Sequence, residues 1–282
     1  MQRPFAPAPR RVPLSIRVAN TFNMFSQIGW FLLAFSSIFV WVFVGNADLS
    51  FVTFRGEVAK AVAQVTKVEE TNASEDDTKV MATHYQYSVA GQPFSGVAYS
   101  TGSSKSVGER VEIEYKPATP AQSRIPGMRR AMFSPFVLFV LIFPAVGAAF
   151  VYAAFRVGRR RNHALEHGLL AAGRLVEKNP TNMTVNDRPV WEMVFEFTAR
   201  DGQKHRATAN TTDAERLEDE HTEPLLYDPE DPSRAYVLDE APARPEVNDV
   251  GELLGRPAAY ARLVLPAIVI LGNAAAYVLL KG

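Results

Sequence analysis

The feature that most constrains this chain is an uncharged run of 25 residues, Ala131 to Phe155, with four arginines directly after it. A helix rises about 1.5 Å per residue, so a run of this length can cross a bilayer core about 30 Å thick. Soluble proteins rarely contain so long an apolar helix with cations so close to its end. The run therefore predicts a membrane-spanning helix, assigned to residues 129–156, that separates two polar segments of the chain.

Two further apolar blocks, residues 26–44 and 263–280, predict spans at 21–46 and 261–281. The alternative for the first block is a cleaved signal peptide, whose apolar region is normally shorter, at about 7–15 residues. The third block is 18 residues long, near the lower limit for a span. We therefore expect three transmembrane helices.

Arginines predict how these spans are oriented, because short cytoplasmic flanks are enriched in Lys and Arg. Four arginines precede the first span and four follow the second, which places the N-terminus and residues 157–240 in the cytoplasm. Residues 47–128 and the C-terminus would then lie outside, across a membrane that the Ala- and Arg-rich composition suggests is a bacterial inner membrane. Arg124, Arg129 and Arg130 argue the other way, so an inverted orientation is the alternative. The topology-setting residues are Arg10, Arg11, Arg17, Arg156, Arg159, Arg160 and Arg161.

Composition excludes several kinds of chemistry. Lys plus Arg and Asp plus Glu both number 30, so no net charge favours a nucleic-acid partner. The chain has no cysteine, which excludes disulfides, thiolate catalysis and cysteine-ligated metals. Four prolines among the arginines of residues 1–20 predict a basic tail that is disordered or lies along anionic headgroups.

Both polar segments alternate apolar and polar residues with the period of half-buried antiparallel strands. In the first segment, Tyr85 and Tyr87 alternate with polar neighbours before a turn at Gly91. In the second, Trp191, Met193, Phe195 and Phe197 form one apolar face. We expect an α+β membrane protein with three transmembrane helices and two small antiparallel β-sandwich or barrel-like domains, at residues 47–128 and at residues 157–240 with a leading helix, followed by a linker at 241–260.

A Tyr-x-Pro-x-x-Pro motif closes both segments and is followed, after a short gap, by Ser-Arg. The two copies lie 112 residues apart at the motif tyrosine and 111 apart at the turn glycine, so the spacing predicts an internal duplication. Proline ends a strand and tyrosine can cover the sheet end, which makes a structural role our interpretation. A polyproline-type ligand is the alternative. The repeated residues are Tyr87, Gly91, Tyr115, Pro117 and Pro120 in the first copy, and Phe197, Gly202, Tyr227, Pro229 and Pro232 in the second.

On these motifs the chain resembles the domain of unknown function 3592 family, over roughly residues 57–125 and 168–238. The matching pieces are Tyr87 with Gly91, and the stretch from Val111 to Pro120. The second copy departs from the pattern, with Phe197 in the tyrosine position and Leu225 for the valine. The resemblance implies a membrane-tethered β-domain protein and brings no active site with it.

Residues suited to catalysis or metal binding are scattered. His163 and His167 are four residues apart, as metal ligands on a helix can be, but no third ligand is spaced to join them. We interpret them as part of a polar helix face and expect no catalytic residue, cofactor or metal. The predicted spans contain no Asp or Glu, and their long apolar runs contain no ionisable group of the kind that transporters need at membrane depth.

These observations favour a non-catalytic scaffold, accessory subunit or immunity-type protein. Its expected partners are the lipid bilayer and a protein in or near the membrane, with a homo-oligomer as a further form. One alternative is a membrane hydrolase or envelope-modifying enzyme that uses His84 or His205 with nearby acids. The other is a sensor that relays a signal between its two domains.

Overall fold

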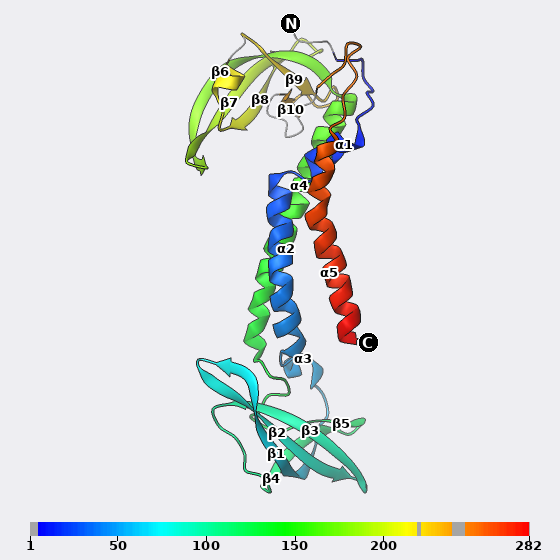
Figure 1. Ribbon diagram of the computed structural model, residues 1–282, viewed down its shortest axis with the longest axis vertical. Helices are drawn as coiled ribbons and strands as arrows, with labels where there is room; N and C mark the ends of the chain where they lie inside the picture. Colours follow the sequence, from blue (N-terminus) through cyan, green and yellow to red (C-terminus); the bar gives the residue numbers. More distant parts are fainter. Residues whose placement is uncertain (1–4, 219–220, 239–245, 282) are drawn as a thin grey trace. The chain divides into compact units, whose positions relative to one another are not determined.

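The computed structural model describes residues 5–218, 221–238 and 246–281 (Figure 1). It is an α+β fold with two antiparallel sheets of five strands each and three helices long and apolar enough to cross a membrane. The chain divides into two compact units, residues 35–144 and residues 1–34 with 145–282. Predicted segments that reach residues 1–4, 219–220, 239–245 or 282 lie partly outside the described residues.

The three membrane-length helices span Met24–Asn46, Pro135–His167 and Pro257–Leu279. The first consists of α2 (Met24–Phe43) and η1 (Val44–Asn46), the second of η2 (Pro135–Leu141) and α4 (Ile142–His167), and the third of η5 (Pro257–Leu263) and α5 (Val264–Lys281). The second helix thus begins at Pro135 rather than at residue 129, because proline suits the first turn of a helix and residues 129–134 extend away from it.

The expected disorder of residues 1–20 is wrong from Phe5 onward. Leu14–Thr21 forms the helix α1, whose apolar face packs into a core that includes Ile16, Leu165 and Leu253. The segment predicted as a linker contributes Leu253 to this core, so its described part, residues 246–260, also folds. Prolines precede α1 rather than interrupt it, and burial of its apolar face stabilises a helix too short to persist alone.

Glycines set the close approach of α2 and α4. A Cβ atom on Gly29 would lie 2.7 Å from the Gly147 carbonyl oxygen, and one on Gly147 would lie 2.9 Å from that of Gly29. Farther along α4, a Cβ on Gly158 would lie 2.6 Å from the Cα of Thr21. Any larger residue would push these backbones apart, which is how small residues permit tight helix pairing in membranes.

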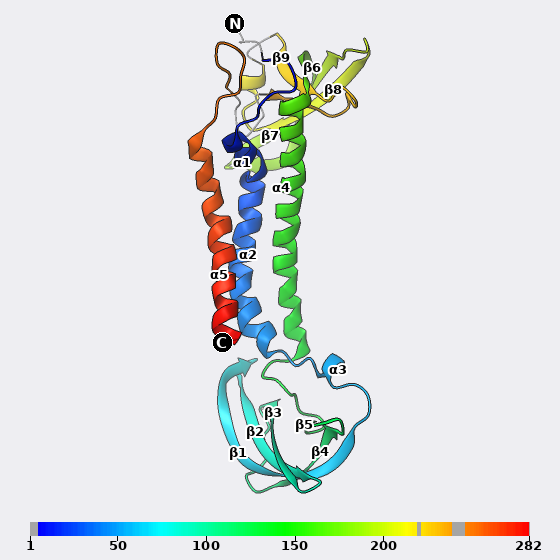
Figure 2. The same cartoon turned by 90° about the vertical axis from the view of Figure 1, so that its right-hand side faces the viewer.

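The first sheet has the order β3-β2-β1-β4-β5. Its strands are β1 (Ala59–Glu75), β2 (Thr78–Val89), β3 (Gln92–Thr101), β4 (Arg110–Lys116) and β5 (Thr119–Arg124), with the short helix α3 (Ser50–Thr53) ahead of them. The sheet curves along β1 and β2 and is not closed (Figure 2). Its core includes Val65, Tyr85, Tyr87 and Ile113, the inward positions of the alternating pattern.

The second sheet has the order β10-β9-β6-β7-β8. Its strands are β6 (Leu169–Val185), β7 (Arg188–Thr198), β8 (Lys204–Thr211), β9 (Glu223–Tyr227) and β10 (Ala235–Val237), with η3 (Glu215–Leu217) between β8 and β9. Met193, Phe195, Phe197 and Leu225 lie at the centre of its core. The apolar face predicted from Trp191 to Phe197 is therefore the buried face of β7.

The two sheets have the same connectivity. Counted from their long first strands, β1 and β6, each sheet has its second and third strands on one side and its fourth and fifth on the other. Both first hairpins turn through two residues with positive φ, Asp76-Asp77 and Asn186-Asp187, as a two-residue turn that matches strand twist requires. The pairing of β1 with β2 shifts after Val65, and that of β6 with β7 shifts after Leu175, 110 residues later.

Candidate functional site

The Tyr-x-Pro-x-x-Pro motif of the first domain lies in the β4–β5 hairpin and fastens it to β2. The hydroxyl of Tyr87 donates to the carbonyl oxygen of Pro120. The Tyr87 ring packs 6.3 Å from the Tyr115 ring and stacks 5.7 Å from that of Phe94, measured between centroids. Gly91 has a φ of +81° in the β2–β3 turn. The motif residues of this hairpin thus pack at the edge of the core.

A second tyrosine on β2 extends this closure. Tyr85 is completely buried, and its hydroxyl lies 2.9 Å from the Ser123 Oγ on β5. Its ring fills the space above Gly96 on β3, where a Cβ would lie only 2.4 Å from Cζ of the ring. Burial raises the pKa of the Tyr85 phenol. The side chain therefore acts as a neutral link between β2 and β5.

In the second domain the motif has the same place but different partners. The Tyr227 ring lies 5.3 Å from the Phe197 ring, and the Tyr227 hydroxyl accepts a hydrogen bond from the Arg200 backbone N–H. Phenylalanine can occupy position 197 because the hydroxyl that bonds to the backbone here belongs to the motif tyrosine, Tyr227. Pro229 and Pro232 lie in the turn between β9 and β10, and Gly202, with a φ of +79°, turns the chain between β7 and β8.

Beside the first motif, three cations surround one buried ring, an arrangement we call the Phe54 cluster. Phe54 is 5% exposed. The guanidinium carbons of Arg124 and Arg130 lie 4.7 and 4.9 Å from its ring centroid, and the Lys116 Nζ lies 5.7 Å from it. These distances fall within cation–π range. Lys116 follows the motif tyrosine, so the motif hairpin itself supplies part of the cluster.

The charges of the Phe54 cluster are incompletely paired. Arg124 forms an ion pair with Glu114, 2.7 Å apart. Arg130 donates from Nε to the Ser123 carbonyl oxygen, and within the described part of the chain its guanidinium has no carboxylate partner. The Lys116 Nζ donates to the Arg55 carbonyl oxygen and likewise has no carboxylate partner there. The cluster is therefore suited to an anionic group.

Sequence reasoning did not find the Phe54 cluster. Phe54 lies just after α3, outside every motif, and the alternation of the strands contains no sign of it. The available signal was the pair of cations, Lys116 and Arg124, that brackets the motif hairpin. Arg129, also noted for its charge, forms an ion pair with Glu75 at 2.6 Å.

The arginines that precede the first span are partly built into the fold. Arg10 is buried, and its guanidinium donates to the Leu165 carbonyl oxygen over 3.0 Å. Burial lowers the pKa of this guanidinium. Arg17 forms an ion pair with Glu166 at 2.8 Å, whereas Arg11 is exposed.

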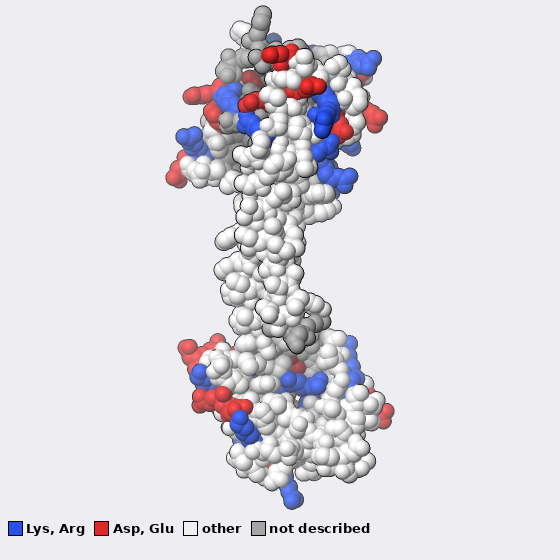
Figure 3. Space-filling model, turned by 45° about the vertical axis from the view of Figure 1, so that its right-hand side comes forward, with Lys and Arg blue, Asp and Glu red and all other residues white. Residues whose placement is uncertain are grey.

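The arginines at the end of the second helix line its polar surface. Arg156 and Arg159 each lie over an aromatic ring four residues earlier, 5.9 and 5.8 Å from the centroids, and Arg160 is exposed. Burial of the Tyr236 hydroxyl raises the pKa of that phenol, and the nearby charge of Arg161 opposes the rise. On the visible face of the spans, no Lys, Arg, Asp or Glu appears before these flanks (Figure 3).

The structure does not bring the histidines together into a site. The rings of His163 and His167 lie 4.8 Å apart, and His163 Nε2 is 4.0 Å from Asp228 Oδ2. Within residues 5–218, 221–238 and 246–281, no group of three His, Cys, Asp or Glu residues is placed to hold a metal.

The two histidines of the enzyme hypothesis lie on separate sheets. His84 on β2 pairs with Glu69 at 2.8 Å, and His205 on β8 lies 3.6 Å from Asp201. Each has its own carboxylate neighbour within its own domain.

Comparison with known proteins finds one similarity. Residues 56–128 match the model of a family described as "Domain of unknown function (DUF3592)", in agreement with the resemblance seen in the first motif. Comparisons with curated proteins and with solved structures each found no match.

Proposed function

We propose that this chain is a non-catalytic integral membrane protein that binds another membrane or membrane-proximal protein, as a scaffold, an accessory subunit or an immunity-type factor. Its helices hold two β-domains at the membrane, and the second domain presents the binding surface. A homo-oligomer is a further form of the same proposal.

The observation that carries this proposal is the exposed tip of the β6–β7 hairpin. Met183 and Val185, near the end of β6, are 58% and 41% exposed. Both tips have the same local fold: Thr71 and Thr181 each accept a hydrogen bond, at 3.2 Å, from the N–H two residues on. The positions that match Met183 and Val185 in the first domain are Ala73, which is 8% exposed, and Glu75, which pairs with Arg129. Two neighbouring apolar side chains exposed at this tip, where the counterpart tip exposes none, support an interaction surface here.

The proposal includes a second copy of the family domain at residues 168–238. The shared strand order, the matching hairpin turns and the 110-residue offset of the pairing shifts support it. The family match itself covers only the first copy.

We also propose the orientation that the arginine count favours, in a bacterial inner membrane, with the N-terminus and second domain in the cytoplasm. The support for this orientation is the count of four arginines before the first span and four after the second.

The test is co-purification from native membranes in mild detergent, with mass spectrometry of what accompanies the chain. We expect the wild type to retain a stoichiometric protein partner that the double variant Met183→Lys/Val185→Lys loses. The control is Val62→Lys on β1, a side chain that is 66% exposed in the first domain. Retention of the partner by the double variant, or the lack of any stoichiometric partner, would overturn the proposal.

A further inference from the structure

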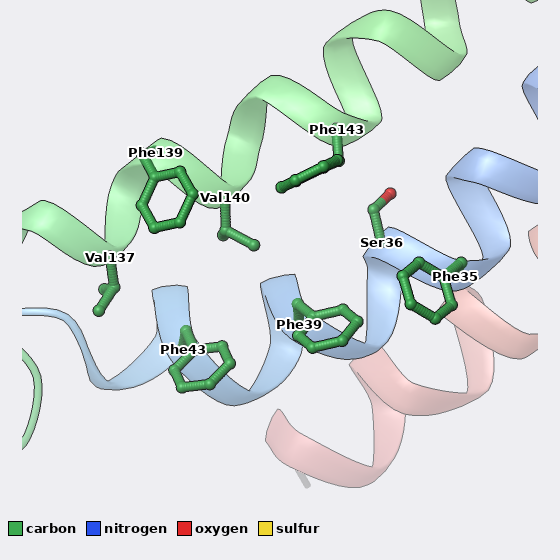
Figure 4. Close-up of a pocket in the computed structure, with 8 residues that line it drawn as sticks. All are labelled: Phe35, Ser36, Phe39, Phe43, Val137, Phe139, Val140 and Phe143. Carbon is green, nitrogen blue, oxygen red and sulfur yellow. The ribbon is translucent and has the colours of Figure 1, made fainter. Parts of the chain in front are cut away.

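Within residues 35–144, a groove lined by phenylalanines lies between α2 and the η2–α4 helix (Figure 4). Its volume is about 350 Å³, within the range of small-ligand pockets. Two valines and the buried Ser36 complete the lining. The rings that line it belong to Phe35, Phe39, Phe43, Phe139 and Phe143.

The groove opens to the surroundings of the helices. Phe35 and Phe139 are 53% exposed, and Phe143 is 49% exposed. Both helices qualify as membrane spans, so their exposed faces meet acyl chains. A groove of this kind in a bilayer is occupied by hydrocarbon.

A ladder of rings leads from the groove toward the first β-domain. Phe35, Phe39 and Phe43 follow one another at four-residue intervals on α2, with centroids 5.1 and 6.2 Å apart. The Phe43 ring then meets the Phe133 ring edge-on, with centroids 5.0 Å apart. At 1.5 Å per residue, the positions of Phe35 and Phe43 lie about 12 Å apart along the helix axis.

Two hydrogen bonds connect the end of this ladder to the Phe54 cluster. The Asp48 backbone N–H donates to the Phe133 carbonyl oxygen over 2.8 Å, and an Asp48 carboxylate oxygen accepts the Arg130 backbone N–H over 3.2 Å. The groove and the cations therefore lie at neighbouring levels of the same unit. On the way from the helices to the first β-domain, the apolar groove comes first and the cationic cluster follows. This is also the order of acyl chain and phosphate in a phospholipid.

We propose that this unit binds one anionic phospholipid, with an acyl chain in the phenylalanine groove and the headgroup phosphate at Arg130. A guanidinium binds phosphate oxygens through paired N–H donors, and the Arg130 guanidinium donates to the described part of the chain through its Nε alone. Lys116 adds a second cation that has no carboxylate partner among the described residues. Asp48 and Glu114 offset part of the positive charge of the three cations and leave a net excess of one, which favours an anionic headgroup over a zwitterionic one.

The experiment uses the full chain, reconstituted in bilayers of equal phosphatidylglycerol and phosphatidylcholine and then extracted in mild detergent. Native mass spectrometry reads the lipid that stays bound. We expect the wild type to retain about one phosphatidylglycerol per chain. Loss of the phosphate contact in Arg130→Gln should weaken retention about tenfold.

Two further variants separate the parts of the site. Arg110→Gln removes an exposed arginine from β4 of the same domain, away from any ring contact, and should retain lipid as the wild type does. Val137→Trp, which fills the groove without touching the cations, should reduce retention as well.

Three outcomes would overturn the proposal. Equal retention of the two lipids would show that the headgroup is not recognised. Unchanged retention in Arg130→Gln would show that the cluster is not part of the site. A lipid-free dimer, captured by a disulfide between Phe139→Cys chains, would show that a second copy covers the groove.

Discussion

The pairing of Tyr85 with Gly96 across β2 and β3 makes the sharpest stability prediction. These residues face each other in the ladder, and their counterparts in the second sheet are Phe195 and Ala207. Where the ring carries a hydroxyl, the facing residue is glycine, and where it does not, the facing residue is alanine. We infer that the extra oxygen and the missing methyl compensate for each other.

The substitution Gly96→Ala tests this compensation. Its Cβ would lie 2.4 Å from the Tyr85 Cζ and 2.5 Å from the hydroxyl oxygen, both inside van der Waals contact. The ring is completely buried and its hydroxyl is hydrogen-bonded to Ser123, so it has little freedom to move. Overpacking of this kind typically costs about 1–3 kcal/mol.

The second variant, Tyr85→Phe, removes the hydroxyl and leaves the Ser123 Oγ buried without its partner, at a cost of about 1–2 kcal/mol. The double variant recreates the pair found in the second sheet. Without its tether to Ser123 the ring can shift to admit the methyl group, so we expect the double variant to cost at least about 1 kcal/mol less than the sum of the single changes.

Amide hydrogen exchange of the full chain in nanodiscs measures these costs strand by strand. We expect Gly96→Ala to speed exchange in β2 and β3 by about 5- to 150-fold and to leave β7 and β8 unchanged. Ala207→Gly, at the matching position of the second sheet, is the control for loss of strand propensity. Unchanged exchange in Gly96→Ala, or costs that simply add in the double variant, would refute the compensation.

Two other predictions follow from buried contacts. Burial acts to raise the pKa of Glu75, but hydrogen bonds from Thr101 and Arg129 and the Arg129 charge outweigh it and hold the pKa below its usual 4.5. Because its pKa is depressed, Glu75 stabilises the first hairpin above about pH 4.5, and this stabilisation is lost as pH falls through the lowered value. Protection at the β1–β2 tip, measured as exchange relative to the unfolded rate at the same pH, should therefore fall below about pH 4.5 in the wild type and lack this dependence in Glu75→Gln. Gly147→Val should separate α2 from α4 at Gly29, which slower disulfide formation between cysteines introduced on the two helices would report; an unchanged rate would contradict the close packing.

Much of the fold was predictable because its signals are local. The apolar runs are long enough to require helices, and the alternation around Tyr85 and Phe195 is that of strands with one buried face. Helix ends were less predictable, since the second helix begins at Pro135 for a reason of first-turn geometry that hydropathy does not record.

Features that depend on distant packing could not be predicted. The close contact between α2 and α4 is made by Gly29 and Gly147, and no local feature of either helix identifies its partner. Arg10 was predicted to belong to a basic tail, because no local feature of the sequence shows that its guanidinium donates to the Leu165 carbonyl oxygen. In both cases the deciding partner is more than 100 residues away.

The two copies of the motif show how one turn can serve different surroundings. In each, the motif tyrosine packs on an aromatic ring of the second strand, Tyr87 on β2 or Phe197 on β7. This contact is therefore set by the sheet itself. The next residue lies outside the apolar core clusters and differs in charge: Lys116 joins the Phe54 cluster, whereas the buried Asp228 lies 3.9 Å from Arg234 and 4.0 Å from His163. Because the ring contact of the motif tyrosine does not constrain the next position, the charge there can suit the side chains beside each hairpin. The charge after the motif tyrosine can therefore differ between the two domains while their sheets stay alike.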